Sequence, residues 1–231
     1  MKSNFKDANE AFEYFKLMIQ NVGTDFDNTK ALFNVGFYIE NPERNLILCD
    51  KRNWKRDYAE AEWQWYLSGD RNIKKLGELY GKVPEIWKRM ADEKGNVNSN
   101  YGYQWSRRTG VPYKGGTKHV KQLSYVINLL KDNPKTRQAA ISIYDAKEHD
   151  KYEFDTPCTY AVQFTIFKGK LDMCVTMRSN DLWYGFCNDQ YCFSKLQLLV
   201  AYELDIPIGE YYHFAHNLHL YNNIIEKIND R

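Results

Sequence analysis

The chain has 231 residues, with 32 Lys and Arg against 30 Asp and Glu, and 43% of its residues are hydrophobic. A chain of this length suits one large domain and buries roughly 70–75% of its unfolded surface without help from disulfides or metals. The composition excludes a disordered or collagen-like chain, and the formal net charge of +2 argues against a protein built to coat nucleic acid or an acidic membrane.

The first half of the chain has the pattern of helices separated by loops. Apolar residues at helical spacing predict helices at residues 8–20, 57–67, 84–93 and 119–131, and Gly23 marks the expected end of the first. Mixed apolar and aromatic residues at 31–38 predict a strand. The Asn- and Gly-rich stretch 96–103 is expected to be a loop.

The second half is richer in strands. Residues 159–167 and 171–178 carry many β-branched and aromatic side chains and are joined by Lys168-Gly169-Lys170, which predicts a hairpin. A helix at 191–204, a strand at 210–220 and a short helix at 221–230 are expected to follow. The pattern predicts an α+β fold with an antiparallel-rich mixed sheet and packed helices, in a single domain over residues 1–231.

Cys158 is the candidate nucleophile. It follows Pro157 at the start of a predicted strand, where a thiol can be partly exposed and activated by a nearby cation. A free cysteine is more often a small buried hydrophobe, and we expect that role for the cysteines Cys49, Cys174 and Cys192. Arg178 and Ser179 end the next predicted strand and offer a guanidinium and a hydroxyl to a phosphate, although alone they could form a polar turn.

These pieces together resemble the thymidylate synthase superfamily, over about residues 33–223. The motifs that carry the resemblance are Glu62 in the segment 62–70, Ile86-Trp87, residues 98–105, Asn133-Pro134-Lys135-Thr136-Arg137, Pro157-Cys158, Arg178-Ser179-Asn180-Asp181 and His219-Leu220-Tyr221. The resemblance implies a thymidylate synthase-like catalytic domain in a homodimer. It also implies a pyrimidine nucleoside monophosphate as substrate and 5,10-methylenetetrahydrofolate as carbon donor, without a metal.

The resemblance also implies catalytic roles. Cys158 matches the nucleophile that adds to C6 of the base, Glu62 the glutamate that organises water and protons, and Tyr101 the active-site tyrosine. Asp181 and Trp87 match residues on the folate side. The residue types suit the chemistry, because C5 of a pyrimidine is a poor nucleophile until a thiolate adds to C6.

The substrate-binding roles follow in the same way. Arg178 and Ser179 match phosphate ligands, and Arg137 matches an arginine that reaches the phosphate site of the partner subunit. His219 and Tyr221 match residues that hold the sugar hydroxyl. A cluster of cations is expected for a nucleotide, since its phosphate carries about two negative charges.

Asp189 stands where synthases acting on deoxyuridylate carry Asn. Cytosine presents an amino donor at C4 and an acceptor at N3, and a carboxyl group can accept from the amino group and share a proton with N3. Hydrogen bonds to charged groups contribute about 1.5–3 kcal/mol, enough for roughly ten- to hundredfold discrimination. The alternatives are that Asp189 is a surface loop residue, or that the neighbouring Asn188 takes its place.

Three further departures point the same way as Asp189, toward cytosine. Thr159 and Met177 replace the usual His and Gln, and Asn188-Asp189 after Gly185-Phe186 resembles the deoxycytidylate 5-hydroxymethylases of T-even phages. These enzymes of the superfamily add water, not hydride, to the C5 methylene. Little sequence follows Tyr221, so we expect no counterpart of the tail that seals the folate pocket in synthases.

The resulting hypothesis is C5-hydroxymethylation of a cytidine monophosphate, in the first place deoxycytidylate. The alternatives are methylation of deoxyuridylate or deoxycytidylate with dihydrofolate as co-product, or a catalytically silent nucleotide- or RNA-binding protein.

The basic pair Lys51-Arg52 is expected to be a solvated face, and the series His213, His216 and His219 is not expected to converge on a metal. The absence of CxxC pairs and of long apolar runs predicts a reduced cytoplasmic protein, in the host cytoplasm if a phage encodes it.

Overall fold

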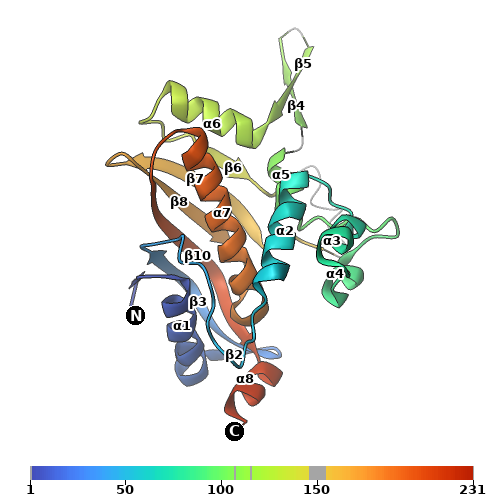
Figure 1. Cartoon of the computed structure of the whole chain (residues 1–231), viewed down its shortest axis with the longest axis vertical. Coiled ribbons are helices and arrows are strands. Elements are labelled where there is room, and N and C mark those ends of the chain that lie inside the picture. The colour runs from blue at the N-terminus through green and yellow to red at the C-terminus, as the bar shows by residue number, and fades with distance from the viewer. Residues whose placement is uncertain (1, 107, 115, 146–154, 231) are drawn as a thin grey trace. The chain divides into compact units, whose positions relative to one another are not determined.

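A computed structural model describes residues 2–106, 108–114, 116–145 and 155–230 (Figure 1). The chain divides into two compact units. Unit 1 comprises Met1–Arg56 and Phe167–Arg231, and unit 2 comprises Asp57–Ile166. Among the helices of the described ranges, none combines the length and apolar character that crossing a membrane requires.

Unit 1 is built on a mixed sheet with strand order β1-β3-β10-β8. Its elements are β1 (Asn4–Phe5), α1 (Ala8–Val22), β2 (Thr24–Phe26), β3 (Thr29–Ile39), β8 (Lys170–Met177), β9 (Asn180–Asp181), the π-helical turn η2 (Leu182–Phe186), α7 (Cys187–Glu203), β10 (Ile208–Tyr221) and α8 (Asn222–Asn229). Strand β10 runs antiparallel to β3 and parallel to β8, because helix α7 carries the chain back between β8 and β10.

The sheet of unit 1 has one covered face and one open face. On the covered face, Phe37 of β3 meets Phe15 of α1 and Phe186 of η2, with ring centroids 4.6 and 5.9 Å apart. Alternate residues of β10 point the other way, and Tyr212 and Phe214 are only half-buried there. The open face of this sheet therefore presents half-buried aromatic side chains.

Unit 2 consists mainly of short helices around an aromatic core. Its elements are α2 (Arg56–Ser68), α3 (Ile73–Tyr80), α4 (Glu85–Met90), α5 (Tyr101–Ser106), β4 (Arg108–Tyr113), β5 (Gly116–Lys121), α6 (Gln122–Asp132), β6 (Ala140–Ser142) and β7 (Thr159–Phe167). Strand β6 pairs antiparallel with β7, and β4 with β5. Trp65 and Trp105 are fully buried in this unit.

The predicted α+β fold with a mixed sheet and packed helices is confirmed. The strand predicted at 159–167 has the bounds of β7, and Lys168 and Gly169, both at positive φ, form the tight turn that leads to β8. The loop predicted at 96–103 is wrong in its last three residues. Helix α5 begins at Tyr101 because the Asn100 side chain accepts the Tyr103 N–H at 2.7 Å and caps the helix.

Two other boundaries differ from the prediction. The helix predicted from 119 begins at Gln122, since residues up to Lys121 belong to β5. Helix α7 begins at Cys187, earlier than the predicted residue 191, as a continuation of η2. Asp189 consequently lies in the first turn of α7, so its alternative placement in a surface loop is wrong.

Candidate active site

Glu62 is a buried carboxyl group on α2 in unit 2. Glu62 is only 5% exposed, and its Oε1 accepts a hydrogen bond from the Tyr66 hydroxyl at 3.1 Å. Oε2 has no hydrogen-bond partner among the described residues. Burial raises the pKa of Glu62 to about 7, against smaller opposing contributions from the Tyr66 and Tyr58 hydroxyls. A carboxyl group that titrates near neutral pH is suited to taking up and releasing a proton.

Tyr101 packs against Tyr66, the tyrosine that donates to Glu62. The two tyrosine rings have centroids 5.6 Å apart. Their approach depends on Gly102, because a Cβ there would lie 1.8 Å from the Tyr66 carbonyl oxygen. Unit 2 therefore brings Glu62 and Tyr101 into one cluster of buried polar side chains.

Trp87 of α4 reaches the same part of unit 2. Its Nε1 donates to the Tyr58 hydroxyl at 2.7 Å. Tyr58 in turn opposes the rise in the pKa of Glu62 through a side-chain hydrogen bond. Its ring packs edge-on against Trp65, with centroids 5.2 Å apart. Trp87 is buried by these contacts and holds one side of the cluster.

Cys158 lies at the bend that leads into β7 and is half-buried. The sequence offered no role for Asp155, three residues earlier, and the structure gives it one. The Asp155 carboxylate accepts both the backbone N–H of Ser99, at 2.6 Å, and the Ser99 hydroxyl. These hydrogen bonds join the segment of Cys158 to the loop that precedes Tyr101, and Asp155 is only 2% exposed.

Arg137 is exposed and lines a groove of about 360 Å³ in unit 2. Lys135 lines the same groove, which therefore holds two cations and the hydroxyls of Thr136 and Thr165. This combination suits a phosphate group.

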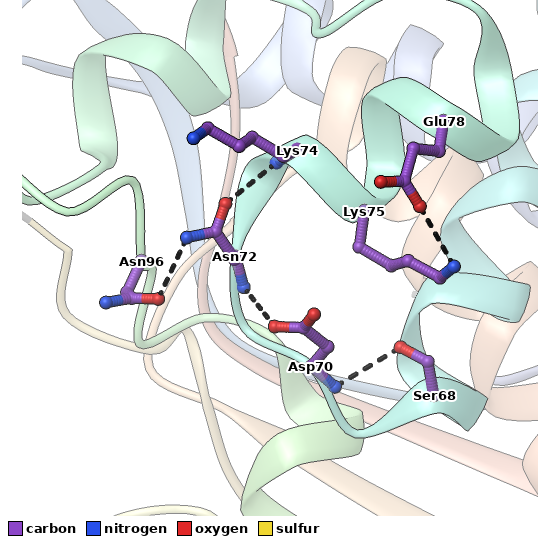
Figure 2. A pocket seen from close by; sticks show the side chains of 7 residues that line it. All are labelled: Ser68, Asp70, Asn72, Lys74, Lys75, Glu78 and Asn96. Atoms are coloured by element: carbon purple, nitrogen blue, oxygen red, sulfur yellow. Dashed lines mark hydrogen bonds and ion pairs between the residues drawn. The ribbon is translucent and has the colours of Figure 1, made fainter.

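A larger recess of about 690 Å³ lies between α2, α3 and the loop around Asn96 (Figure 2). None of the predicted site residues lines it. Its polar side chains bind one another: Asn72 accepts from the Lys74 N–H and donates to Asn96, and Lys75 pairs with Glu78. We assign these bonds to holding the start of α3.

Asp189 forms the centre of a polar cluster in unit 1. Its Oδ2 accepts Nδ2 of Asn180 at 2.8 Å. Oδ1 of Asn180 lies 3.1 Å from Nε2 of His213, and Nδ1 of His213 lies 2.8 Å from the Tyr211 hydroxyl. Gly185 leaves room for the cluster, because a Cβ there would lie 3.1 Å from Asn180 Nδ2 and 3.2 Å from Asp189 Oδ2.

The neighbouring Asn188 is directed elsewhere, with its Oδ1 accepting Nε1 of Trp54 at 2.8 Å. Sequence reasoning considered His213 only as a metal ligand and missed Tyr211 and Asn180. The alternation along β10, which buries His213 and exposes His216, was the available signal. In the described ranges, no group of three or more His, Cys, Asp or Glu could hold a metal ion.

Asp181 caps the turn η2, and its Oδ1 accepts the Trp183 N–H at 2.8 Å. Burial raises the pKa of this carboxyl group to about 6, against backbone N–H groups and Arg52. The expectation that Arg52 belongs to a solvated face is wrong. Its Nε donates to the Trp183 carbonyl at 2.5 Å, and its guanidinium lies 5.4 Å from the centre of the Tyr184 ring.

Arg178 and Ser179 follow the end of β8 and are half-buried. His219 and Tyr221 lie at the end of β10, with ring centroids 5.3 Å apart, and Nδ1 of His219 bonds Oδ1 of Asn217 at 2.9 Å. Burial lowers the pKa of His219. In unit 2, Tyr101 and Trp87 thus connect to Glu62 through Tyr66 and Tyr58, whereas Arg137 lines a separate groove. In unit 1, the predicted site residues lie at the ends of β8 and β10, in β9 and at the start of α7.

Comparison with known proteins gives two findings. A family model described as thymidylate synthase matches residues 20–231. A curated protein of Corynebacterium aurimucosum named thymidylate synthase is 32% identical over 171 residues, which are 74% of this chain and 61% of that relative. The chain therefore matches about three-fifths of the relative's length.

Proposed function

Because the chain belongs to the thymidylate synthase family, we propose that it transfers a one-carbon unit to C5 of a pyrimidine nucleoside monophosphate. The proposed substrate is a cytidine monophosphate, first of all deoxycytidylate, and the proposed product is its 5-hydroxymethyl derivative. The observation that carries this choice is the Asn180 amide, which donates to Asp189 and leaves it an acceptor. A hydrogen-bond acceptor suits the 4-amino group of cytosine, which donates, and repels O4 of uracil, which also accepts.

The proposed reaction balances without an oxidant. The Cys158 thiolate adds to C6 of the base, which makes C5 nucleophilic, and the methylenetetrahydrofolate co-substrate supplies a carbon at the level of formaldehyde. C5 bonds to this carbon as the first of its two bonds to folate nitrogens breaks, the base loses its C5 proton, and the second carbon–nitrogen bond breaks so that the folate leaves. Water then adds to the exocyclic methylene carbon, and the thiolate leaves C6. The two folate nitrogens take up the C5 proton and the proton that water releases. The products are 5-hydroxymethyldeoxycytidylate and tetrahydrofolate.

Glu62 is proposed to manage water and protons in these steps. With a pKa of about 7 it is partly protonated at neutral pH. Among the described residues its Oε2 has no hydrogen-bond partner, and this supports the role, because a buried carboxyl oxygen of this kind is suited to binding water. Tyr101, which packs on Tyr66, is proposed to act beside it.

The folate side is proposed to use Asp181 and Trp87. A pterin ring presents N–H donors, and a carboxylate offers about four lone-pair sites. One oxygen of Asp181 caps Trp183, so the group retains capacity for a second donor. The buried indole of Trp87, oriented by Tyr58, offers an apolar surface of the kind that a flat ring needs.

The phosphate and sugar are proposed to be bound by Arg178, Ser179, His219 and Tyr221. Arg137 is proposed to complete the phosphate site of a partner subunit. The position after Arg137 is Gln138, where a second arginine is usual in the family. Lys135 in the same groove supplies the second positive charge.

A homodimer is proposed through the open face of the unit 1 sheet. The rings of Tyr38 and Tyr212 pack there at a tilt of 55°, with centroids 4.6 Å apart, and Phe214 is half-buried on the same face. Exposed aromatic clusters of this kind mark interaction surfaces. We expect Phe214→Asp to shift the protein toward the monomer in analytical ultracentrifugation, and Tyr202→Asp, on the exposed side of α7, to leave the dimer intact.

The second candidate function is methylation, as the relative's name, thymidylate synthase, indicates. It requires a hydride from the folate and produces dihydrofolate. The experiment is to incubate the protein with methylenetetrahydrofolate and either deoxycytidylate or deoxyuridylate, and to analyse nucleotide and folate by mass spectrometry. We expect a hydroxymethyl product and tetrahydrofolate with deoxycytidylate. Dihydrofolate formed in step with product would overturn the hydroxymethylase proposal.

Release of tritium from C5-labelled deoxycytidylate tests for chemistry at that carbon in the presence of the folate. Wild-type protein is expected to release it, and Cys158→Ser is expected to release none. No release from wild type would favour a silent nucleotide- or RNA-binding protein.

A further inference from the structure

Three buried side chains in unit 1 form a series of hydrogen bonds that ends at Asp189. Tyr211 and His213 come from the covered face of β10, and Asn180 comes from β9. None of the three is more than 2% exposed. The proposed reaction assigns no step to any of them, so their polar groups need another explanation.

Burial determines the charge states of His213 and Tyr211. It lowers the pKa of His213 to about 3, so the imidazole is neutral and carries one N–H. It also raises the pKa of Tyr211 well above its usual value, with a further contribution from the negative charge of Asp189. The phenol therefore keeps its proton.

The direction of each hydrogen bond follows from the Asn180 amide. Its Nδ2 donates to Asp189 Oδ2, which turns its Oδ1 toward His213. An amide oxygen only accepts, so the single imidazole proton must lie on Nε2. Nδ1 is then a bare acceptor for the Tyr211 hydroxyl. All three bonds run in one direction, toward the carboxylate.

We propose that Tyr211, His213 and Asn180 are positioning residues that select cytosine over uracil, by holding the Asn180 amide as a donor to Asp189. The inference rests on the proposed function. With Oδ2 held by Asn180, the carboxylate faces the base as an acceptor for the 4-amino group. If the amide turned over, its oxygen would face the carboxylate, and the repulsion would favour a protonated Asp189 that can donate to O4 of uracil.

Paired substitutions separate positioning from packing. Glutamine at position 213 can accept from Tyr211 and donate to Asn180, whereas leucine can do neither. We expect His213→Leu to lower the ratio of kcat/KM for deoxycytidylate to that for deoxyuridylate by roughly tenfold, and His213→Gln to retain most of it. Tyr211→Phe should lower the ratio roughly three- to tenfold. Its control, Tyr191→Phe, removes a hydroxyl from another buried tyrosine of unit 1 and should leave the ratio unchanged.

The outcomes distinguish the two proposals. A wild-type protein that prefers deoxycytidylate, with variants that keep this preference within about twofold, would overturn the inference alone. A wild type that prefers deoxyuridylate would overturn both the inference and the proposed function.

A measurement on the wild-type protein reports the hydrogen-bond direction at His213 without a kinetic assay. Long-range proton–nitrogen NMR of the histidine-labelled wild type reports the tautomer, and the His213→Gln spectrum assigns the signal. We expect a neutral His213 at neutral pH with its proton on Nε2. A proton on Nδ1, or a charged ring, would overturn the inference.

Discussion

Replacing Glu62 by glutamine tests whether its carboxyl group is buried as the structure describes. The pKa of Glu62 rises from its ordinary 4.5 to about 7 in the folded protein. Between these values the folded state binds more protons than the unfolded state, so stability falls as the pH rises through this window and levels off above it. The 2.5-unit difference corresponds to roughly 3 kcal/mol of lost stability at high pH, and less than about 1 kcal/mol is lost at about pH 5.

Glu62→Gln keeps the shape of the side chain and removes its ionisable carboxyl group. We expect the free energy of unfolding of the variant, relative to wild type, to rise by roughly 2–2.5 kcal/mol between about pH 5 and about pH 9. Urea unfolding followed by tryptophan fluorescence measures it, since Trp65 and Trp105 are buried in the same unit. Glu60→Gln, on the same helix but half-exposed, is the matched control and should show no such slope. A flat difference for Glu62→Gln would refute a buried, poorly partnered carboxyl group.

Two further substitutions address the proposed reaction. Asp189→Asn should shift the preference toward deoxyuridylate by roughly ten- to hundredfold in competition assays, and an unchanged preference would show that the base is selected elsewhere. Asp155→Ala leaves the Ser99 N–H and hydroxyl without their acceptor, so tritium release from C5-labelled deoxycytidylate should slow through kcat more than KM. Asp155→Asn retains one acceptor oxygen and should lose less. Equal rates for the two variants would contradict a positioning role.

Local patterns were sufficient to predict most elements. Helix α1 has an N-cap in Asp7 and ends before Gly23, and β7 and β8 carry the β-branched residues that strands favour. Helix α5 was missed because its start depends on a single capping side chain, Asn100, within a segment whose composition is typical of loops.

Only those residues of the site that belong to recognisable sequence motifs could be predicted. The contact of Asn180 with His213 joins residues 33 positions apart, and no periodicity indicates it. Arg52 was misjudged for the same reason, because the carbonyl that it binds lies 131 positions further along the chain, at Trp183 in a π-helical turn. Asp155 and Ser99, 56 positions apart, are a third example. Long-range polar partners were thus the part of the site that the sequence alone did not reveal.

The most direct test of the account is to trap the protein on its substrate. A fluorine at C5 cannot leave as a cation, so a base attacked at C6 and carrying the new carbon stays bound to the thiol. With methylenetetrahydrofolate present, we expect 5-fluorodeoxycytidylate to modify the peptide that contains Cys158, faster than 5-fluorodeoxyuridylate does, as measured by mass spectrometry. Modification of another cysteine, no modification, or faster trapping by the uridylate analogue would contradict the account.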